Sequence, residues 1–272
     1  MGLNYREDKH LDFLKDQDNG NLDVLVKLLM YDKDGEKRYA EELSGCEQYR
    51  EHKPNHQKYW HLIAAEYQTF GGNSIVNIFR SQGVPYDEIL RDVCGEMDVK
   101  FSENDRVVDI ELELLSKVGA KVIEEMSIEE RERFLKDLNI DTTNLTKQAT
   151  LLAMQTAIRG SGFMAYQFAV IIANTIAKQL LGHGLKLVAN AGMVRAIGAF
   201  AGPFGLAATG IWSLIDLSGA AYRVTIPASI YIAALRQAEL NKNYFEMKCP
   251  NCDAIILDRD IDTCQQCGEE YR

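Results

Sequence analysis

Four cysteines near the C-terminus have the spacing of a metal site. They form two CxxC pairs, Cys249-Pro250-Asn251-Cys252 and Cys264-Gln265-Gln266-Cys267, with eleven residues between the pairs. A two-residue spacer forms a tight turn that directs both thiolates of a pair at one ion, and two pairs supply four tetrahedral sulfur ligands. The sequence therefore predicts a zinc ribbon over residues 249–272 with a structural Zn²⁺. Its four ligands would be Cys249, Cys252, Cys264 and Cys267.

Other roles for these cysteines are weaker. Iron fits the same sulfur cage and is the second candidate metal. A dithiol redox centre is disfavoured because it needs only one CxxC pair. Four sulfur ligands leave no open coordination position, so we expect no catalysis at the ion. Gly268 should permit the turn after the second pair, Cys46 lacks metal-ligand spacing, and Cys94 is expected in the core.

A glycine-rich break and a group of histidines are the next candidates. Gly71-Gly72-Asn73-Ser74 would present backbone amides at a helix start, which can hold phosphate. It lacks the lysine and the preceding strand of a phosphate loop, so a helix corner with a polar cap is favoured. His52, His56 and His61 are close in sequence, but Pro54 separates the first two. We expect solvated surface histidines.

Carboxylates are the last candidate group. The acid-rich segments 105–113 and 124–132 could supply an acid and a base, but helical periodicity places them on polar faces. We therefore predict no catalytic residue, no small-molecule substrate and a protein that is not an enzyme. A pocket that gathered His61, Glu66 and Ser74 would revive an enzymatic function.

The first 150 residues have the pattern of short amphipathic helices with clear start signals. Asn21 is expected to cap a helix over Leu22–Met30, and Pro85 to be the first residue of a later helix. No strand is expected in this region. Two capping boxes are predicted, at Ser102 with Asp105 and at Ser127 with Glu130.

Two long uncharged runs, Gly160–Ala177 and Ala196–Ile215, dominate the next segment. As helices they would be about 27 Å and 30 Å long, close to the hydrocarbon thickness of a bilayer. Gly182-His183-Gly184 lies between them and predicts a turn, so we expect a glycine-rich helical hairpin. A hairpin that is buried or inserts conditionally is favoured over a permanent two-span anchor. Pro203 should kink or end the second arm.

Arg223 is the only charged residue between Asp216 and Arg236. A buried arginine needs a partner, and Asp216 is the nearest candidate in sequence. The two residues are two helical turns apart, so their contact would need a break near Gly219.

Charge is distributed unevenly along the chain. Residues 1–150 carry a net charge of −11, residues 151–240 of +4 and residues 241–272 of −3. The acidic front argues against nucleic acid as a partner, because phosphate binding needs clustered cations. The basic segment is also the apolar one, which suits an anionic membrane surface. The N-terminus lacks the apolar core of a secretory signal, so we expect a cytoplasmic, reducing location, with membrane association as an addition.

Several motifs resemble the bacterial YaaW-like family. They are Phe70-Gly71-Gly72-Asn73-Ser74-Ile75, the Pro85–Met97 helix, Gly182-His183-Gly184 and Ala221-Tyr222-Arg223-Val224-Thr225-Ile226-Pro227. The resemblance covers roughly residues 1–236. It implies an all-helical protein with no catalytic residues to carry over, and a relation to ubiquinol–cytochrome c reductase assembly chaperones. The cysteine module is an addition to the short family members.

Together these features predict a mainly α protein. Its parts would be an acidic helical domain (1–150), an apolar hairpin region (151–236), a linker (237–248) and the zinc ribbon (249–272). The expected function is non-enzymatic: the hairpin mediates membrane association or self-association, and the acidic helices and ribbon bind protein partners. The alternatives are a chaperone-like client binder and a membrane-permeabilising effector.

Overall fold

The structure is a computed structural model. It describes residues 3–32, 34–71, 83–137, 140, 143–181, 219–241, 249, 251–252, 263–264 and 266–270. These residues form α-helices and short 3-10 helices, and within them no strand occurs, only the isolated bridges Tyr31–Lys37 and Thr263–Glu270. The α-helices are α1 Asn19–Met30, α2 Glu47–His52, α3 Trp60–Gly71, α4 Tyr86–Glu96, α5 Val107–Glu125, α6 Ile128–Asp137, α7 Lys147–Gly160, α8 Gly162–Leu181 and α10 Tyr222–Asn241. The 3-10 helices are η1 Asp12–Asp16, η2 Leu43–Gly45 and η3 His56–Tyr59. The mainly α prediction is confirmed.

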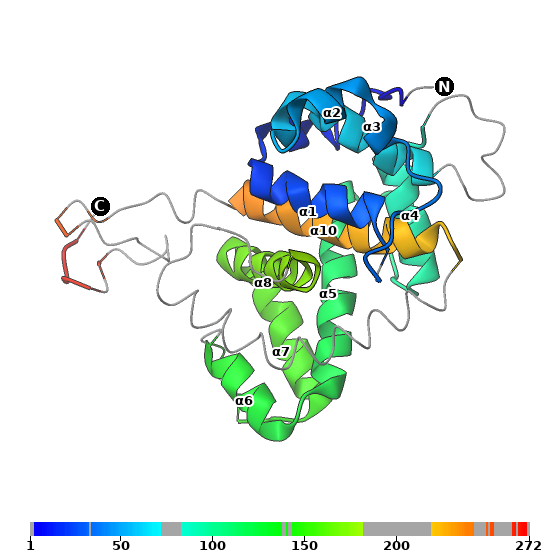
Figure 1. Ribbon diagram of the computed structural model, residues 1–272. Helices are drawn as coiled ribbons and strands as arrows, with labels where there is room; N and C mark the ends of the chain where they lie inside the picture. Colours follow the sequence, from blue (N-terminus) through cyan, green and yellow to red (C-terminus); the bar gives the residue numbers. More distant parts are fainter. Residues whose placement is uncertain are drawn as a thin grey trace.

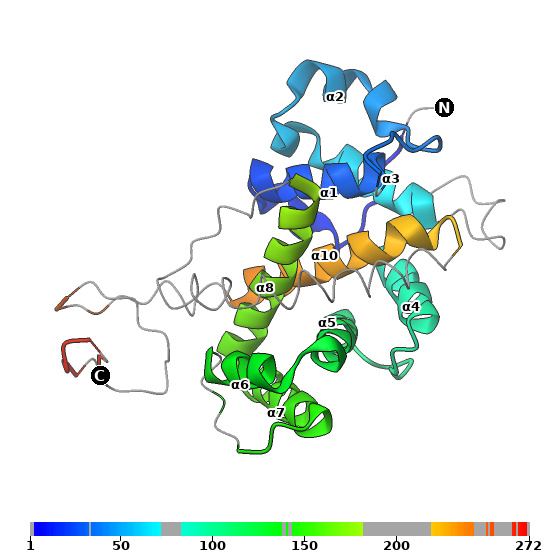
Figure 2. The same ribbon diagram turned by 60° about the horizontal axis from the view of Figure 1, so that its bottom comes forward.

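Helix α10 lies at the centre of the helical assembly. It packs against α8, α5, α1, α4 and α3. Figure 1 shows α1 running alongside α10, and Figure 2 shows α8 crossing it. Burial explains this position, because nearly every side chain from Val224 to Leu235 is shielded from water. A helix that is apolar on all sides needs neighbours on all sides.

One hydrophobic core joins the early helices to the apolar segment. Residues of the expected domains 1–150 and 151–236 both contribute to it, for example Leu25, Leu114, Phe168 and Tyr231. Gly119 allows the close approach of α5 to α8, since a Cβ atom there would collide with the ring of Phe168.

The first apolar run is a core helix. Its residues belong mainly to α8, and those from Ala165 to Ala173 are buried, as is Ala177. Within the described parts of the chain, no individual helix combines the length and composition of a bilayer span. The helices Lys147–Gly160 and Met164–Ala177 have the length and composition of a span only when they are counted as one pair. A bend of 113° separates them. The predicted turn at Gly182–Gly184 and the second run, Ala196–Ile215, lie outside the described residues.

One of the two predicted capping boxes forms at the start of a helix. The Ser127–Glu130 capping box is confirmed: the Ser127 N–H donates to the Glu130 carboxylate at 2.7 Å, and the Glu130 N–H donates to Ser127 Oγ at 3.2 Å. The Ser102–Asp105 pair forms a turn instead, because α5 begins only at Val107.

Two other predicted starts are displaced. Asp18 caps α1, not Asn21: its carboxylate accepts the Asn21 N–H at 2.7 Å, and the helix begins at Asn19. Pro85 is the residue before α4 and not its first residue.

Helix α10 contains a proline in its interior. Pro227 has no N–H for the carbonyl of Arg223 four residues earlier. Arg38 Nη2 lies 3.5 Å from that carbonyl oxygen and donates to it. The predicted partner of Arg223, Asp216, lies outside the described residues. At its other end α10 continues to Asn241, so residues 237–241 of the expected linker are helical.

Candidate metal centre

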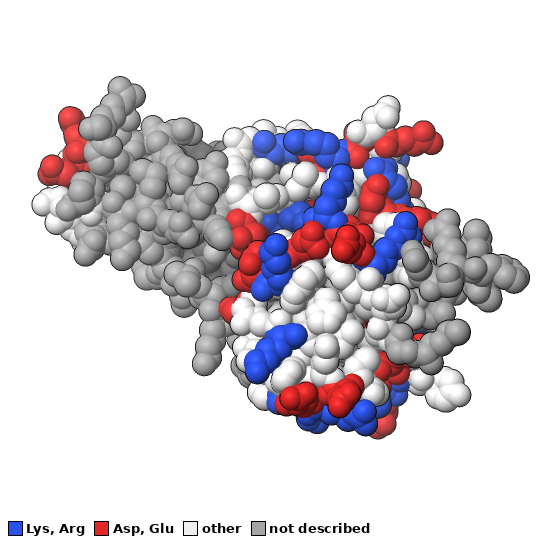
Figure 3. All heavy atoms as spheres, turned by 90° about the horizontal axis from the view of Figure 1, so that it is seen from above, with Lys and Arg blue, Asp and Glu red and all other residues white. Residues whose placement is uncertain are grey.

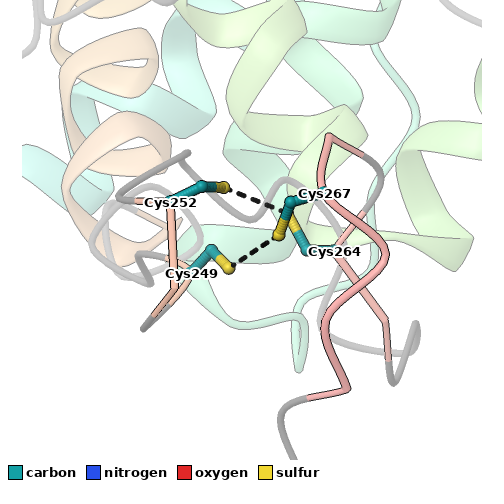
Figure 4. A group of neighbouring side chains, drawn as sticks. All are labelled: Cys249, Cys252, Cys264 and Cys267. Atoms are coloured by element: carbon teal, nitrogen blue, oxygen red, sulfur yellow. Dashed lines mark hydrogen bonds between the residues drawn. The ribbon is translucent and has the colours of Figure 1, made fainter.

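The four predicted ligands come together at the C-terminal end of the chain (Figure 4). Their sulfur atoms all lie within 4.8 Å of one another. The sulfurs of Cys249 and Cys267 are 3.5 Å apart, and those of Cys252 and Cys264 are 3.7 Å apart. Four sulfurs at about 2.3 Å from a tetrahedral Zn²⁺ would be separated by about 3.8 Å. The size of the cluster therefore fits this ion.

A local turn positions the second cysteine pair. Gly268 has a φ of 75°, a conformation that favours glycine, and its N–H donates to the Cys264 carbonyl at 2.8 Å. The Cys264 N–H donates in turn to the Glu269 carbonyl at 2.7 Å. The expected role of Gly268 is thus confirmed. Pro250 and residues 253–262 between the pairs lie outside the described residues.

The backbone around Cys264 favours the thiolate form of its side chain. The backbone N–H groups of Cys267 and Gln266 lower the pKa of Cys264 to about 7, and the Gln266 N–H lies 3.4 Å from Cys264 Sγ. Thiolate is the form that binds a metal. Cys249 and Cys264 are buried, whereas Cys252 and Cys267 are exposed. A set of four sulfurs is the donor set of a closed structural site.

The remaining cysteines stand apart from this cluster. Cys94 is fully buried on α4, as predicted, and burial raises the pKa of its thiol to about 12. Such a thiol is unreactive. Cys46 is partly exposed, and its sulfur lies 3.7 Å from the Glu42 carbonyl oxygen.

Within the described residues, His52, His56 and His61 do not form a metal site, and His56 contradicts the sequence prediction. His56 is buried rather than solvated: its Nδ1 lies 2.6 Å from the Tyr59 hydroxyl, and its Nε2 lies 3.3 Å from Asp23. Nδ1 is therefore hydrogen-bonded within the fold, and Nε2 is buried with the Asp23 carboxylate at ion-pair distance. His56 lies near Tyr59 at the start of a helix, and nothing in the sequence around it predicted that its side chain is buried. His61 is partly exposed and lines an open cavity of about 1100 Å³ with Cys46.

Glu66 does not complete a catalytic pocket with His61. Its carboxylate is buried on α3 and accepts the Glu42 N–H at 3.0 Å, so it supports the loop before η2 rather than lining the cavity. Burial raises the pKa of Glu66 to about 7. Ser74, the third residue of the considered enzymatic pocket, lies outside the described residues.

A buried ion pair at the centre of the fold was missed by sequence reasoning. Arg236 Nε donates to Glu111 Oε1 at 2.8 Å, and the Tyr86 hydroxyl donates to the same oxygen at 2.6 Å. The Arg236 guanidinium also stacks on Phe13, 4.3 Å from the ring centroid, and donates to the His10 carbonyl. The pair thus joins α5, α4 and α10 to the N-terminal segment.

Burial disfavours the charged form of the Glu111 carboxylate. It raises the pKa of Glu111 to about 7, and the positive charge of Arg236 partly opposes that rise. Glu111 was expected on a polar helix face, so its burial is a correction. The missed signal was its spacing, one residue after Ile110 and three before Leu114, which places it at the edge of the apolar stripe.

The other acidic residues of these helices behave as predicted. Asp109 is partly exposed and Glu124 is exposed, and they pair with Arg106 and Lys121 at 2.8 Å and 3.1 Å. Figure 3 shows charges of both signs interspersed on the face seen from above. Exposed pairs of this kind contribute little to stability.

Comparison with known proteins places the chain among uncharacterised bacterial relatives. A family described as "Domain of unknown function (DUF3944)" matches residues 5–39. A UPF0174 protein of Helicobacter pylori strain J99 is 41% identical over 233 residues, which is 85% of this chain and 92% of that protein. The UPF0174 protein YaaW of Escherichia coli strain K12 is 32% identical over 243 residues, 87% of this chain and 97% of that protein. No solved structure matches.

Proposed function

This chain belongs to the UPF0174 family, and we propose that it acts by binding rather than by catalysis. In this proposal a structural Zn²⁺ folds the C-terminal segment into a docking unit for a protein partner. The helical core carries that unit and an apolar segment for membrane association or self-association. The proposal rests on one observation above all, the approach of four sulfur atoms to within 4.8 Å of one another.

The four cysteines would hold the ion in a closed site with no open position for catalysis. Bound Zn²⁺ supplies folding free energy to a small segment that has little core of its own. Cys249 and Cys264 would anchor the ion from the buried side, and Cys252 and Cys267 would close it from the exposed side. Since each thiol must lose its proton to bind Zn²⁺ as thiolate, the affinity for zinc should fall as the pH falls below 7.

Metal analysis tests this step. The purified full chain should contain about one zinc per molecule, and Cys249→Ser should lose it. Cys46→Ser is the matched control, because Cys46 is a partly exposed cysteine outside the cluster. Zinc content that survives in Cys249→Ser, or that falls equally in Cys46→Ser, would contradict the assignment.

The apolar segment is the second part of the proposal. The first run is occupied by packing within the helical core, which leaves Ala196–Ile215 as the run that would meet lipid or a second copy. Its 20 uncharged residues, bracketed by Arg195 and Asp216, match a hydrocarbon thickness as helix.

Flotation with anionic vesicles tests the membrane contact. The unaltered chain should float, and Phe200→Asp with Ile211→Asp should not. Leu152→Asp is the matched control, because Leu152 is an exposed apolar residue, 66% accessible, on α7. A chain that stays at the bottom of the gradient, and is monomeric in light scattering, would contradict this part.

A client-binding role is the second candidate. The observation that favours it is the open cavity of about 1100 Å³, whose lining combines apolar Leu3 and Leu62 with charged Lys37 and Arg50. In this second candidate function, the mixed surface would accept an extended segment of another protein. Capture of a reduced, unfolded test protein without vesicle binding would support this function over membrane association.

A further inference from the structure

We propose that the cysteine cluster is also a site of reversible oxidation, at which peroxide forms the disulfides Cys249–Cys267 and Cys252–Cys264 and thereby releases the metal. This inference rests on the proposed zinc site and adds a regulated state to it. It concerns the class of two-electron oxidants to which hydrogen peroxide belongs.

The pairing follows from the positions of the sulfurs. The contacts at 3.5 Å and 3.7 Å each join one cysteine of the first pair to one of the second (Figure 4). Each contact also joins an exposed cysteine to a buried one: Cys267 to Cys249, and Cys252 to Cys264. An exposed thiolate next to a second thiol is the arrangement that peroxide oxidises to a disulfide.

The chemistry balances with peroxide alone. The exposed thiolate attacks one peroxide oxygen, the O–O bond breaks, the sulfur becomes a sulfenic acid, and hydroxide leaves and takes up a proton. The buried thiolate then attacks the sulfenic sulfur, the S–S bond forms, the S–O bond breaks, and a second hydroxide leaves as water. Two thiolates thus give two electrons and reduce one peroxide to two waters. Two peroxides consume all four ligands, and neutral disulfide sulfurs no longer hold Zn²⁺.

The oxidised state would keep the C-terminal segment closed without metal. The two disulfides link residues that are 18 and 12 positions apart, and each connects the two halves of the ribbon. Cross-links between the halves replace the metal as the constraint on the chain. The docking unit would therefore alternate between a zinc-bound and a disulfide-bound form, and a thiol reductant with zinc would restore the first.

The test uses the full chain loaded with zinc and freed of reductant. Hydrogen peroxide is added in steps, released zinc is read with 4-(2-pyridylazo)resorcinol, and disulfides are located by peptide mapping without reduction. We expect about one zinc released per chain after about two equivalents of peroxide, with the cross-pair disulfides. Cys46→Ser should release zinc equally, since Cys46 lies outside the cluster.

Three outcomes decide the proposal. Zinc that stays bound while the four thiols remain free would overturn it. Release with the disulfides Cys249–Cys252 and Cys264–Cys267 would overturn the pairing. A reduced chain that takes up no zinc would instead refute the proposed zinc site. The disulfide pattern of that metal-free chain would still support or overturn the cross-pair oxidation.

Discussion

Arg236 and Glu111 form an ion pair inside the protein, with 2.8 Å between Nε and Oε1 and no exposed surface on the carboxylate. The residues come from α10 and α5 and are 125 positions apart. Because a buried charge without a partner is costly, this pair fixes how the central helix sits against the acidic helices.

Loss of Arg236 should therefore be strongly destabilising. Arg236→Met leaves the Glu111 carboxylate buried and unpaired, and we expect a loss of about 3–5 kcal/mol in the free energy of unfolding at pH 8. The loss should be smaller at pH 5, where Glu111 can bind a proton. Urea unfolding measures it. Arg159→Met, which breaks the exposed pair with Glu113, is the control and should cost less than about 1 kcal/mol.

Glu66 should make stability depend on pH. Burial raises its pKa from 4.5 to about 7, so the folded state binds a proton that the unfolded state has released in this range. Its contribution is present below pH 4.5 and is lost as the pH rises through 7. Glu66→Gln should reduce the fall in unfolding free energy between pH 5 and pH 8, by an amount on the order of 1–3 kcal/mol. Exposed Glu47→Gln should leave that slope unchanged.

Gly119 should not tolerate a side chain. Gly119→Val would push the Phe168 ring and Met154 away, and we expect a loss of about 1–3 kcal/mol from overpacking. Gly160→Ala, at the end of α7 with open space around it, should be neutral or slightly stabilising. Equal melting temperatures for the two variants would show that α5 and α8 are not in close contact.

The two predicted capping boxes should differ in energy. Ser127→Ala removes the oxygen that accepts the Glu130 N–H, and should cost about 1 kcal/mol. Ser102→Ala should cost much less, because Ser102 contributes its backbone N–H and α5 begins farther along the chain. Thermal unfolding of the two variants compares them, and an equal loss would mean that both act as caps.

Sequence reasoning predicted the features that depend on local spacing. The helical class, the Ser127 cap and the turn at Gly268 follow from residues a few positions apart, and the grouping of the cysteines follows from the repeated CxxC spacing. Local rules are reliable where the interacting groups are neighbours in the chain.

The features that sequence reasoning missed depend on long-range packing. Glu111 looks like one more acid on a polar helix face, and only the fold places Arg236 beside it. His56 likewise finds Asp23 on another helix. The length of the first apolar run fitted a bilayer and a buried core equally well, and its neighbours α10 and α1 decide for the core.

X-ray absorption at the zinc edge tests the central claim most directly. The purified full chain should give about four sulfur neighbours at about 2.3 Å and no nitrogen or oxygen neighbour, as expected for Cys249, Cys252, Cys264 and Cys267. A spectrum dominated by nitrogen or oxygen ligands, or a chain that holds no zinc after reconstitution under reducing conditions, would contradict this account.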